Sequence, residues 1–77
     1  MSMYEHQVQV LTILSENLLN PQPQLVSTTT IAEQMEIQLP TLHYVLNSMN
    51  SKELIQTNSD LQYSLITRKG LEYLDNT

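Results

Sequence analysis

Apolar residues in the first quarter of the chain recur at the spacing of an α-helix. Between Tyr4 and Leu19 they define one stripe, formed by Tyr4, Val8, Leu11, Leu14 and Leu18. Three further apolar residues, Met3, Val10 and Ile13, fall beside that stripe. Two explanations stay open. The helix has a wide core face, or it carries a second contact surface, such as a dimer or partner interface, at Met3, Val10 and Ile13.

The segment after this helix is rich in proline and glutamine. Pro21 and Pro23 each lack a backbone donor and favour extended conformations in the residues before them. We therefore expect a linker over residues 20–24 that connects two helices inside one domain. Leu25 and Val26, which follow it, are compatible with a short edge strand.

A run of hydroxyl residues precedes the next helical stretch. Ser27 or Thr28 at the N-cap predicts a helix of two turns or more that ends near Met35. Thr30 has the capping-box spacing to Glu33, but a helix that begins there is barely longer than one turn. The earlier cap is therefore preferred.

A short break at residues 36–39 is followed by a third helical pattern. Pro40 suits the first turn of a helix, because its φ angle is already helical and an N–H at that position has no partner in the helix. One buried face is predicted for Leu42, Val45, Leu46 and Met49. The polar positions of the same segment, His43, Tyr44, Asn47, Ser48, Asn50 and Ser51, are predicted to face outward.

The last third of the chain predicts a β-hairpin and a short helix. Residues 54–57 and 62–66 are compatible with strands, and the residues 58–60 between them have turn chemistry. Thr67 suits the N-cap of a helix over residues 68–74, whose inner face holds Leu71 and Leu74, with Tyr73 beside them. Gly70 costs about 1 kcal/mol relative to alanine inside a helix, so we expect another element to approach closely there.

Composition limits the class of protein. The 77 residues make a single small domain spanning 1–77. The chain has no cysteine, which excludes disulfides and thiolate metal sites. No apolar run approaches the roughly 20 residues that span a bilayer, and the first residues do not resemble a secretory signal. We therefore expect a cytoplasmic protein that is not embedded in a membrane.

Catalytic chemistry is not indicated. His6 and His43 are the only imidazoles, and neither has a second candidate ligand in a repeated helical spacing. Gly70 is the only glycine, so a glycine-rich phosphate loop is excluded. The acidic residues are dispersed, without a close pair suited to acid–base work. We expect no enzyme activity, no metal and no cofactor.

The order of elements resembles the winged helix-turn-helix family over nearly the whole chain. Residues 30–37 resemble its first motif helix and turn, and residues 40–49 resemble its recognition helix. Residues 52–55 resemble its entry into the first wing strand, and residues 63–74 resemble the ending of small bacterial and archaeal regulators. The resemblance implies an α+β fold with a three-helix core, a two-stranded β-wing and a short C-terminal helix. Glu36 and Glu53 stand where the family often has glycine.

The resemblance also implies a function, namely transcription regulation in which helix 39–51 enters the major groove of DNA. We expect a dimer, because a net-acidic chain needs two half-site contacts more than a basic chain does. By position in the family, the DNA contacts are Gln38, Leu39, Thr41, His43, Tyr44 and Asn47. Arg68 and Lys69, which open the last helix, are further candidates that could contact a phosphate beside the wing. Amide side chains can pair with adenine, and hydroxyls can reach phosphate oxygens. A solvated polar face, with Arg68 paired to Glu72, is the open alternative.

The net charge of −5 favours a different class of partner. Nucleic-acid binders usually carry a positive surface, whereas this chain has three Lys and Arg residues against eight Asp and Glu. The alternative function is therefore a protein-interaction module that does not bind DNA. A local patch that gathers Lys52, Arg68 and Lys69 would favour DNA, and a negative wing face would favour a protein partner.

Overall fold

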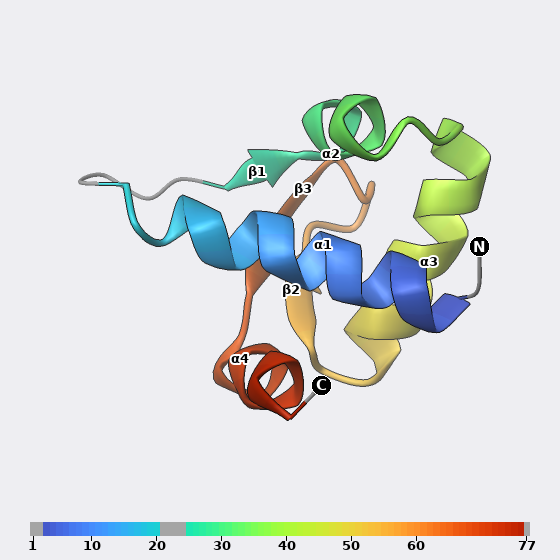
Figure 1. Cartoon of the computed structure of the whole chain (residues 1–77). Coiled ribbons are helices and arrows are strands. Elements are labelled where there is room, and N and C mark those ends of the chain that lie inside the picture. The colour runs from blue at the N-terminus through green and yellow to red at the C-terminus, as the bar shows by residue number, and fades with distance from the viewer. Residues whose placement is uncertain (1–2, 21–24, 77) are drawn as a thin grey trace.

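The computed structural model describes residues 3–20 and 25–76. These form α1 (Met3–Asn17), β1 (Val26–Ser27), α2 (Thr28–Met35), α3 (Leu39–Ser51), β2 (Ile55–Thr57), β3 (Tyr63–Ile66) and α4 (Arg68–Asp75). Helix α1 crosses the front of the molecule, with α2 on one side of it and α4 on the other (Figure 1). Residues 21–24, where the linker is predicted, lie outside the described residues. No helix in the described part of the chain is long and apolar enough to cross a membrane.

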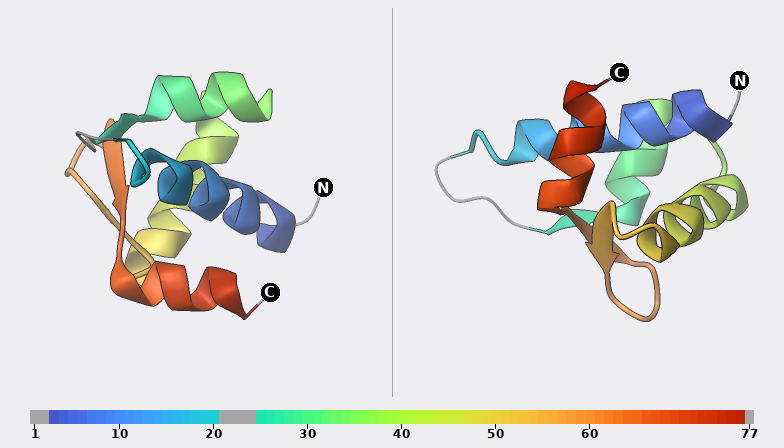
Figure 2. Two further views of the ribbon diagram at one scale, coloured as in Figure 1. Left: turned by 60° about the vertical axis from the view of Figure 1, so that its left-hand side comes forward. Right: turned by 90° about the horizontal axis from the view of Figure 1, so that it is seen from below.

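The sheet is antiparallel, in the order β1-β3-β2. In the predicted hairpin, Ile55 pairs with Ile66 and Thr57 pairs with Ser64. The expected two-stranded wing is thus confirmed, and β1 adds a third strand to its sheet through the pairing of Val26 with Ser64. The predicted edge strand is thus confirmed, displaced by one residue. The turn between β2 and β3 projects beyond the helices, next to α3 (Figure 2).

The core lies between α1, α2, α3 and the sheet. All four predicted core residues of α3 are buried, as are Ile31 and Ala32 of α2. The predicted core stripe of α1 is partly wrong, because Tyr4 and Leu18 are exposed whereas Val10 is fully buried. Gln7, Val10, Leu11 and Leu14 form the observed inner face. The inner face includes the polar Gln7, which a search for apolar residues leaves out. The predicted stripe therefore lies to one side of the observed inner face.

Two hydroxyl side chains begin helices as expected. The Oγ of Ser27 accepts a hydrogen bond from the backbone N–H of Thr30 at 3.1 Å, which confirms the earlier of the two predicted caps. The Oγ1 of Thr67 accepts from the N–H of Gly70 at 3.0 Å and donates to the carbonyl oxygen of Glu53 at 2.7 Å. Thr67 therefore joins the start of α4 to the loop that follows α3.

Gly70 is needed where α4 meets that same loop. A Cβ atom at this position would lie 2.2 Å from the carbonyl oxygen of Leu54 and 2.9 Å from Cγ1 of Ile66. The nearest obstacle is backbone, which cannot move away as a flexible side chain can. The close approach expected at Gly70 is thus confirmed.

Candidate nucleic-acid interface

The outward face of α3 is formed by uncharged side chains. The buried residues of this helix fix its other side against the core. Tyr44 points away from that side with 68% of its surface exposed. Asn47 is also exposed and follows Tyr44 by about one helical turn. The predicted orientation of α3 is therefore confirmed, and it puts Tyr44 and Asn47 next to each other at the surface.

Asn47 keeps its side-chain amide available. The Oγ of Ser51 donates to the main-chain carbonyl oxygen of Asn47 at 3.0 Å, which leaves the side chain of Asn47 untouched. Within the described residues, that side chain has no hydrogen-bond partner. A free primary amide can donate and accept hydrogen bonds at the same time. Asn47 is thus equipped to pair with a group that presents both a donor and an acceptor.

The turn before α3 is made without glycine. Glu36 has φ 57° and ψ 43°, which is the left-handed conformation, and its N–H bonds to the carbonyl oxygen of Ala32. Gln38 is the N-cap residue of α3, but its side chain makes no capping hydrogen bond. Gln38, Pro40 and Thr41 are all exposed. The start of α3 therefore presents uncharged side chains to solvent.

His43 lies in a hollow between α3 and the hairpin turn. The hollow has a volume of about 430 Å³ and is lined by Ser27, Thr28, Thr29, Leu39, His43, Asp60, Leu61, Gln62 and Tyr63. His43 is half-buried there, whereas Tyr44 and Asn47 are exposed. His43 thus flanks the outward face of α3 and turns toward the wing. Asp60 is the one acidic residue of this lining.

The hairpin turn that closes the hollow is held in place by hydrogen bonds. The Oδ1 of Asn58 accepts from the N–H of Gln62 at 2.8 Å and from the N–H of Tyr63 at 3.0 Å. This arrangement accommodates Leu61, whose φ is 56°. The Oγ1 of Thr28 donates to the carbonyl oxygen of Leu61. The backbone N–H of Thr28 donates to the carbonyl oxygen of Gln62 at 2.8 Å. The turn and the start of α2 are therefore tied together.

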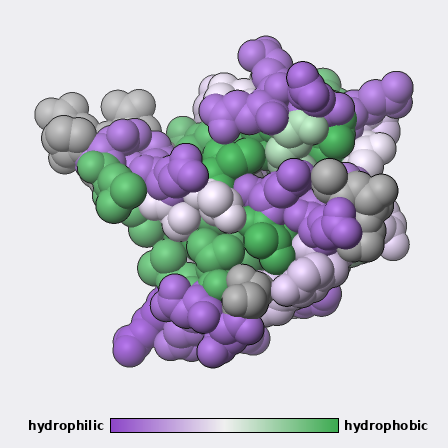
Figure 3. All heavy atoms as spheres, viewed as in Figure 1, coloured by the Kyte–Doolittle hydropathy of each residue, from purple (hydrophilic) through white to green (hydrophobic). Residues whose placement is uncertain are grey.

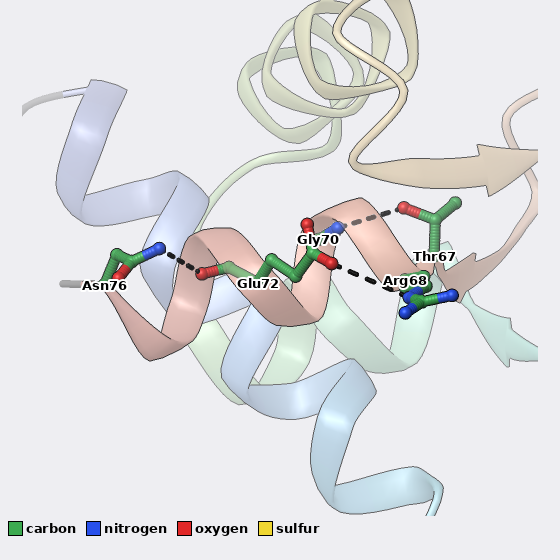
Figure 4. A network of polar contacts seen from close by, with 5 residues as sticks. All are labelled: Thr67, Arg68, Gly70, Glu72 and Asn76. Carbon is green, nitrogen blue, oxygen red and sulfur yellow. Dashed lines mark hydrogen bonds and ion pairs between the residues drawn. The ribbon is translucent and has the colours of Figure 1, made fainter.

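Arg68 and Lys69 lie at the other end of α3. They line a second hollow with Asn50, Glu53, Ile55, Gln56 and Thr67, where the end of α3 meets β2 and α4. Arg68 Nε is 3.6 Å from Glu72 Oε1 (Figure 4). Lys69 Nζ is 3.9 Å from Glu53 Oε2. Both pairs are exposed and contribute little to stability, but each places a carboxylate beside a cation.

The predicted DNA-contact set is thus divided between two places. Gln38, Thr41, His43, Tyr44 and Asn47 lie on the first two-thirds of α3 or just before it. Arg68 and Lys69 are gathered at the far end of a 13-residue helix, about 20 Å long at its usual rise. Lys52 caps that far end but does not line the hollow that holds Arg68 and Lys69. The three cations therefore form no unopposed patch.

The predicted partner interface on α1 needs correction. Val10 is fully buried, so it is not available to a partner. Met3 and Ile13 are half-buried and pack against the core. Ile13 also lines a surface groove between α1 and α2, together with Val8 and Met35. Hydrophobic side chains reach the surface along both sides of α1 (Figure 3).

Several residues of this region were not singled out by the sequence. Asp60, Gln62 and Tyr63 come from the hairpin, and Thr28 and Thr29 come from the start of α2. The hydroxyl run and the turn residues signalled local caps and turns, which they are. Their meeting with His43 depends on how the hairpin folds back over α3, and no local pattern encodes that.

Comparison with known proteins supports the fold. No protein-family model matches the sequence, and no curated protein matches it. A solved structure of a Lactococcus lactis ZitR mutant superposes on 94% of this chain with a TM-score of 0.71 at 19% sequence identity. ZitR is a transcriptional regulator with a winged-helix fold. This chain spans 48% of the length of the ZitR chain.

The fold is a winged helix. Within the winged helix, α2 and α3 form the helix-turn-helix, and β2 and β3 form the wing. The two positions at which the chain departs from the family, Glu36 and Glu53, both have positive φ angles. The winged-helix backbone is therefore kept although glycine is absent at both positions.

Proposed function

We propose that this chain is the DNA-binding unit of a transcriptional regulator, and that α3 enters the major groove. The observation that carries the proposal is the outward face of α3, where Tyr44 and Asn47 are exposed and the Asn47 side chain is unpaired within the described residues. In a helix-turn-helix, the N-terminal residues of the second helix contact base edges. Gln38, Thr41 and His43 supply further polar contacts around that face.

The phosphate contacts come from few groups. Arg68 and Lys69 are the proposed cationic contacts, and each must exchange its carboxylate partner for a phosphate. Thr41 and Tyr44 supply hydroxyl donors. Since a single unit has so little positive charge, we propose that it acts as a cytoplasmic homodimer in which two half-site contacts add up. Met3 and Ile13 of α1 are the proposed dimer contacts that the structure leaves partly accessible.

Salt dependence tests the proposal. Fluorescence anisotropy of the chain with a labelled random-sequence duplex should show binding at low salt that weakens as salt rises. With three Lys and Arg residues per chain, the slope of log K against log salt should be no steeper than about −3 per protomer. Lys69→Gln should make the slope shallower by about one, whereas Lys52→Gln should leave it unchanged.

A second experiment tests whether the outward face of α3 that carries Tyr44 and Asn47, called the reading face below, contacts base edges. Tyr44→Ala combined with Asn47→Ala should abolish sequence preference and leave the thermal midpoint within a few degrees, because both side chains are exposed. Gln34→Ala, an exposed amide on α2, is the matched control and should bind as the wild type does. A double variant that kept the sequence preference of the wild type would contradict the assignment of α3.

A protein-interaction module is the second candidate function. It is favoured by the net charge of −5 and by the absence of any charged residue in α3. The apolar surface of Leu39, Tyr44 and Tyr63, each more than two-fifths exposed, would then contact the partner. The absence of duplex binding at low salt, in the anisotropy experiment above, would favour this candidate.

A further inference from the structure

The chemical content of α3 is unusual for a helix that contacts DNA. Its 13 residues, Leu39–Ser51, include no Arg, Lys, Asp or Glu. The nearest cation along the chain is Lys52, at the C-cap, and the nearest carboxylate before the helix is Glu36, in the turn. Base recognition by this helix therefore depends on amides, hydroxyls, apolar groups and the imidazole of His43.

The edges of base pairs in the major groove demand different groups. Guanine presents two acceptors, which Arg or Lys reads, and cytosine presents an amino donor, which Asp or Glu reads. Adenine presents an acceptor next to a donor, which the amide of Asn or Gln matches, and thymine presents a methyl group for apolar contact. The helix lacks both of the charged residue types that pair most strongly with a G·C pair, and only its hydroxyls and the imidazole of His43 are left for such contacts.

The exposed residues of α3 match the A·T pair instead. Asn47 has a free side-chain amide on the outward face. Tyr44, about one turn before it, exposes 68% of its surface and provides an aromatic ring next to the amide. Thr41, exposed near the start of the helix, adds a methyl group. An A·T pair presents an acceptor and a donor on adenine, which match an amide, and a methyl group on thymine, which matches the apolar surface beside that amide.

We propose that α3 reads A·T base pairs in the major groove. The Nδ2 of Asn47 donates to N7 of an adenine while its Oδ1 accepts from the N6 amino group, and Tyr44 and Thr41 pack on thymine methyl groups. This assignment rests on the proposed function, since it specifies which DNA the same face takes.

The carboxylate of Asp60 is not placed to accept a hydrogen bond from the amino group of a cytosine in front of α3. Asp60 belongs to the hairpin turn and lines the hollow that His43 enters from the flank of α3. It is therefore set beside the outward face and not on it. Near DNA, this carboxylate opposes phosphates and adds no contact on the face that carries Tyr44 and Asn47.

Base analogues test the proposal with the complete chain. Three pools of duplexes are compared by competition at low salt. Each pool contains one kind of base pair, A·T, G·C or inosine·cytosine, with the two bases of the pair distributed at random between the strands. Inosine·cytosine has the minor groove of an A·T pair and the major groove of a G·C pair, because inosine lacks the guanine amino group. The A·T pool should compete about tenfold better or more than both others. Deoxyuridine in place of thymidine, which removes the methyl group, should weaken binding several-fold.

Substitutions test which residues cause the preference for A·T pairs. Asn47→Ala should bring the A·T and G·C pools to similar affinities without changing the salt slope, whereas Lys69→Gln should weaken all pools alike. Equal binding of the three pools by the wild type would overturn the inference and leave the proposed function standing. If inosine·cytosine bound as well as A·T, the minor groove would be the part that is read, and the inference would be wrong. The absence of binding to every pool would reject both it and the proposed function.

Discussion

The two ends of α3 differ in chemistry although they belong to one helix. The N-terminal part is uncharged, carries the exposed Tyr44 and Asn47, and borders an open hollow against the hairpin turn. The C-terminal end is followed by all three Lys and Arg residues of the chain, and it is locked to α4 by Thr67 and by the close approach at Gly70. One end is thus suited to selective contacts, and the other combines charge with a rigid junction.

The contrast between the two ends shows what the proposed DNA binding would require of a net-acidic winged helix. Positive charge is not needed on the reading face if selectivity comes from hydrogen bonds and apolar contacts, but affinity is then low and must come from elsewhere. The ion pairs of Arg68 and Lys69 show that their charges are already partly balanced within the fold. The predictions that follow test the two ends separately, in order of decreasing effect.

The largest effect is expected at the rigid junction. Gly70→Ala forces a Cβ atom against the carbonyl oxygen of Leu54, and overpacking of this kind costs about 2–3 kcal/mol. For a domain of this size, that lowers the thermal midpoint by about 10–20 °C, as circular dichroism would measure. Lys69→Ala, the neighbouring exposed position, should change stability by less than about 0.5 kcal/mol. A Gly70→Ala variant as stable as the wild type would show that the junction is looser than described.

A smaller effect is expected at the hairpin end. Thr28→Val removes the hydrogen bond from the Thr28 hydroxyl to the carbonyl oxygen of Leu61, at a cost of about 1–2 kcal/mol, to be measured by urea denaturation. Thr29→Val is the control, because Thr29 is an exposed neighbour whose side chain makes no hydrogen bond within the described residues. Equal destabilisation by the two variants would contradict a specific tie between α2 and the wing.

The two left-handed glutamates offer one test at each end of α3. Glu36 precedes the helix and Glu53 follows it, and both have φ near 60°. The left-handed conformation costs a residue with a Cβ atom about 1–2 kcal/mol. Glycine avoids this cost, but the larger entropy of its unfolded chain cancels part of the gain in stability. Glu36→Gly and Glu53→Gly should each stabilise the fold by about 0.5–1 kcal/mol.

Alanine at the same two positions separates backbone conformation from charge. Glu36→Ala and Glu53→Ala remove the carboxylate but keep the Cβ atom, so neither should reproduce the gain expected for glycine. If alanine and glycine stabilised the protein equally at either position, charge would be the cause there, and the backbone would carry no strain.

The smallest effect concerns the charge beside the reading face. Asp60→Asn removes a carboxylate from the hollow next to α3. Its repulsion of a nearby phosphate amounts to about 1 kcal/mol or less in water, so DNA affinity at low salt should rise about two- to fivefold. Asp75→Asn makes the same change in charge on exposed α4 and should leave affinity unaltered. An equal gain in both variants would indicate a general effect of net charge.

Local features made much of the fold predictable. The caps at Ser27 and Thr67, the start of α3 at Pro40 and the buried face of α3 all follow from side-chain chemistry within a few residues of where it acts. The hairpin was equally predictable, because a polar turn separates two short apolar stretches. Even the close approach at Gly70 was signalled by a glycine inside a helix.

Tertiary features were not predictable in the same way. The inner face of α1 includes Gln7, and a polar side chain gives no sign in the sequence that it is buried. Val10 therefore falls outside the predicted core stripe although it belongs to the core, which favours the wide core face over a partner surface at this position. The hollow around His43 forms because the hairpin turn comes to lie beside α3, and the split between the reading face and the cations depends on where α4 docks.

The central claim is that the outward face of α3 binds DNA, with Arg68 and Lys69 as the phosphate contacts. Nuclear magnetic resonance of the ¹⁵N-labelled chain, titrated with a random-sequence duplex at low salt, tests it most directly, because each backbone amide reports its own surroundings. The account predicts the largest shift changes at residues 38–47, with further changes at Arg68 and Lys69. Changes confined to the groove between α1 and α2, or no changes at any amide, would contradict it.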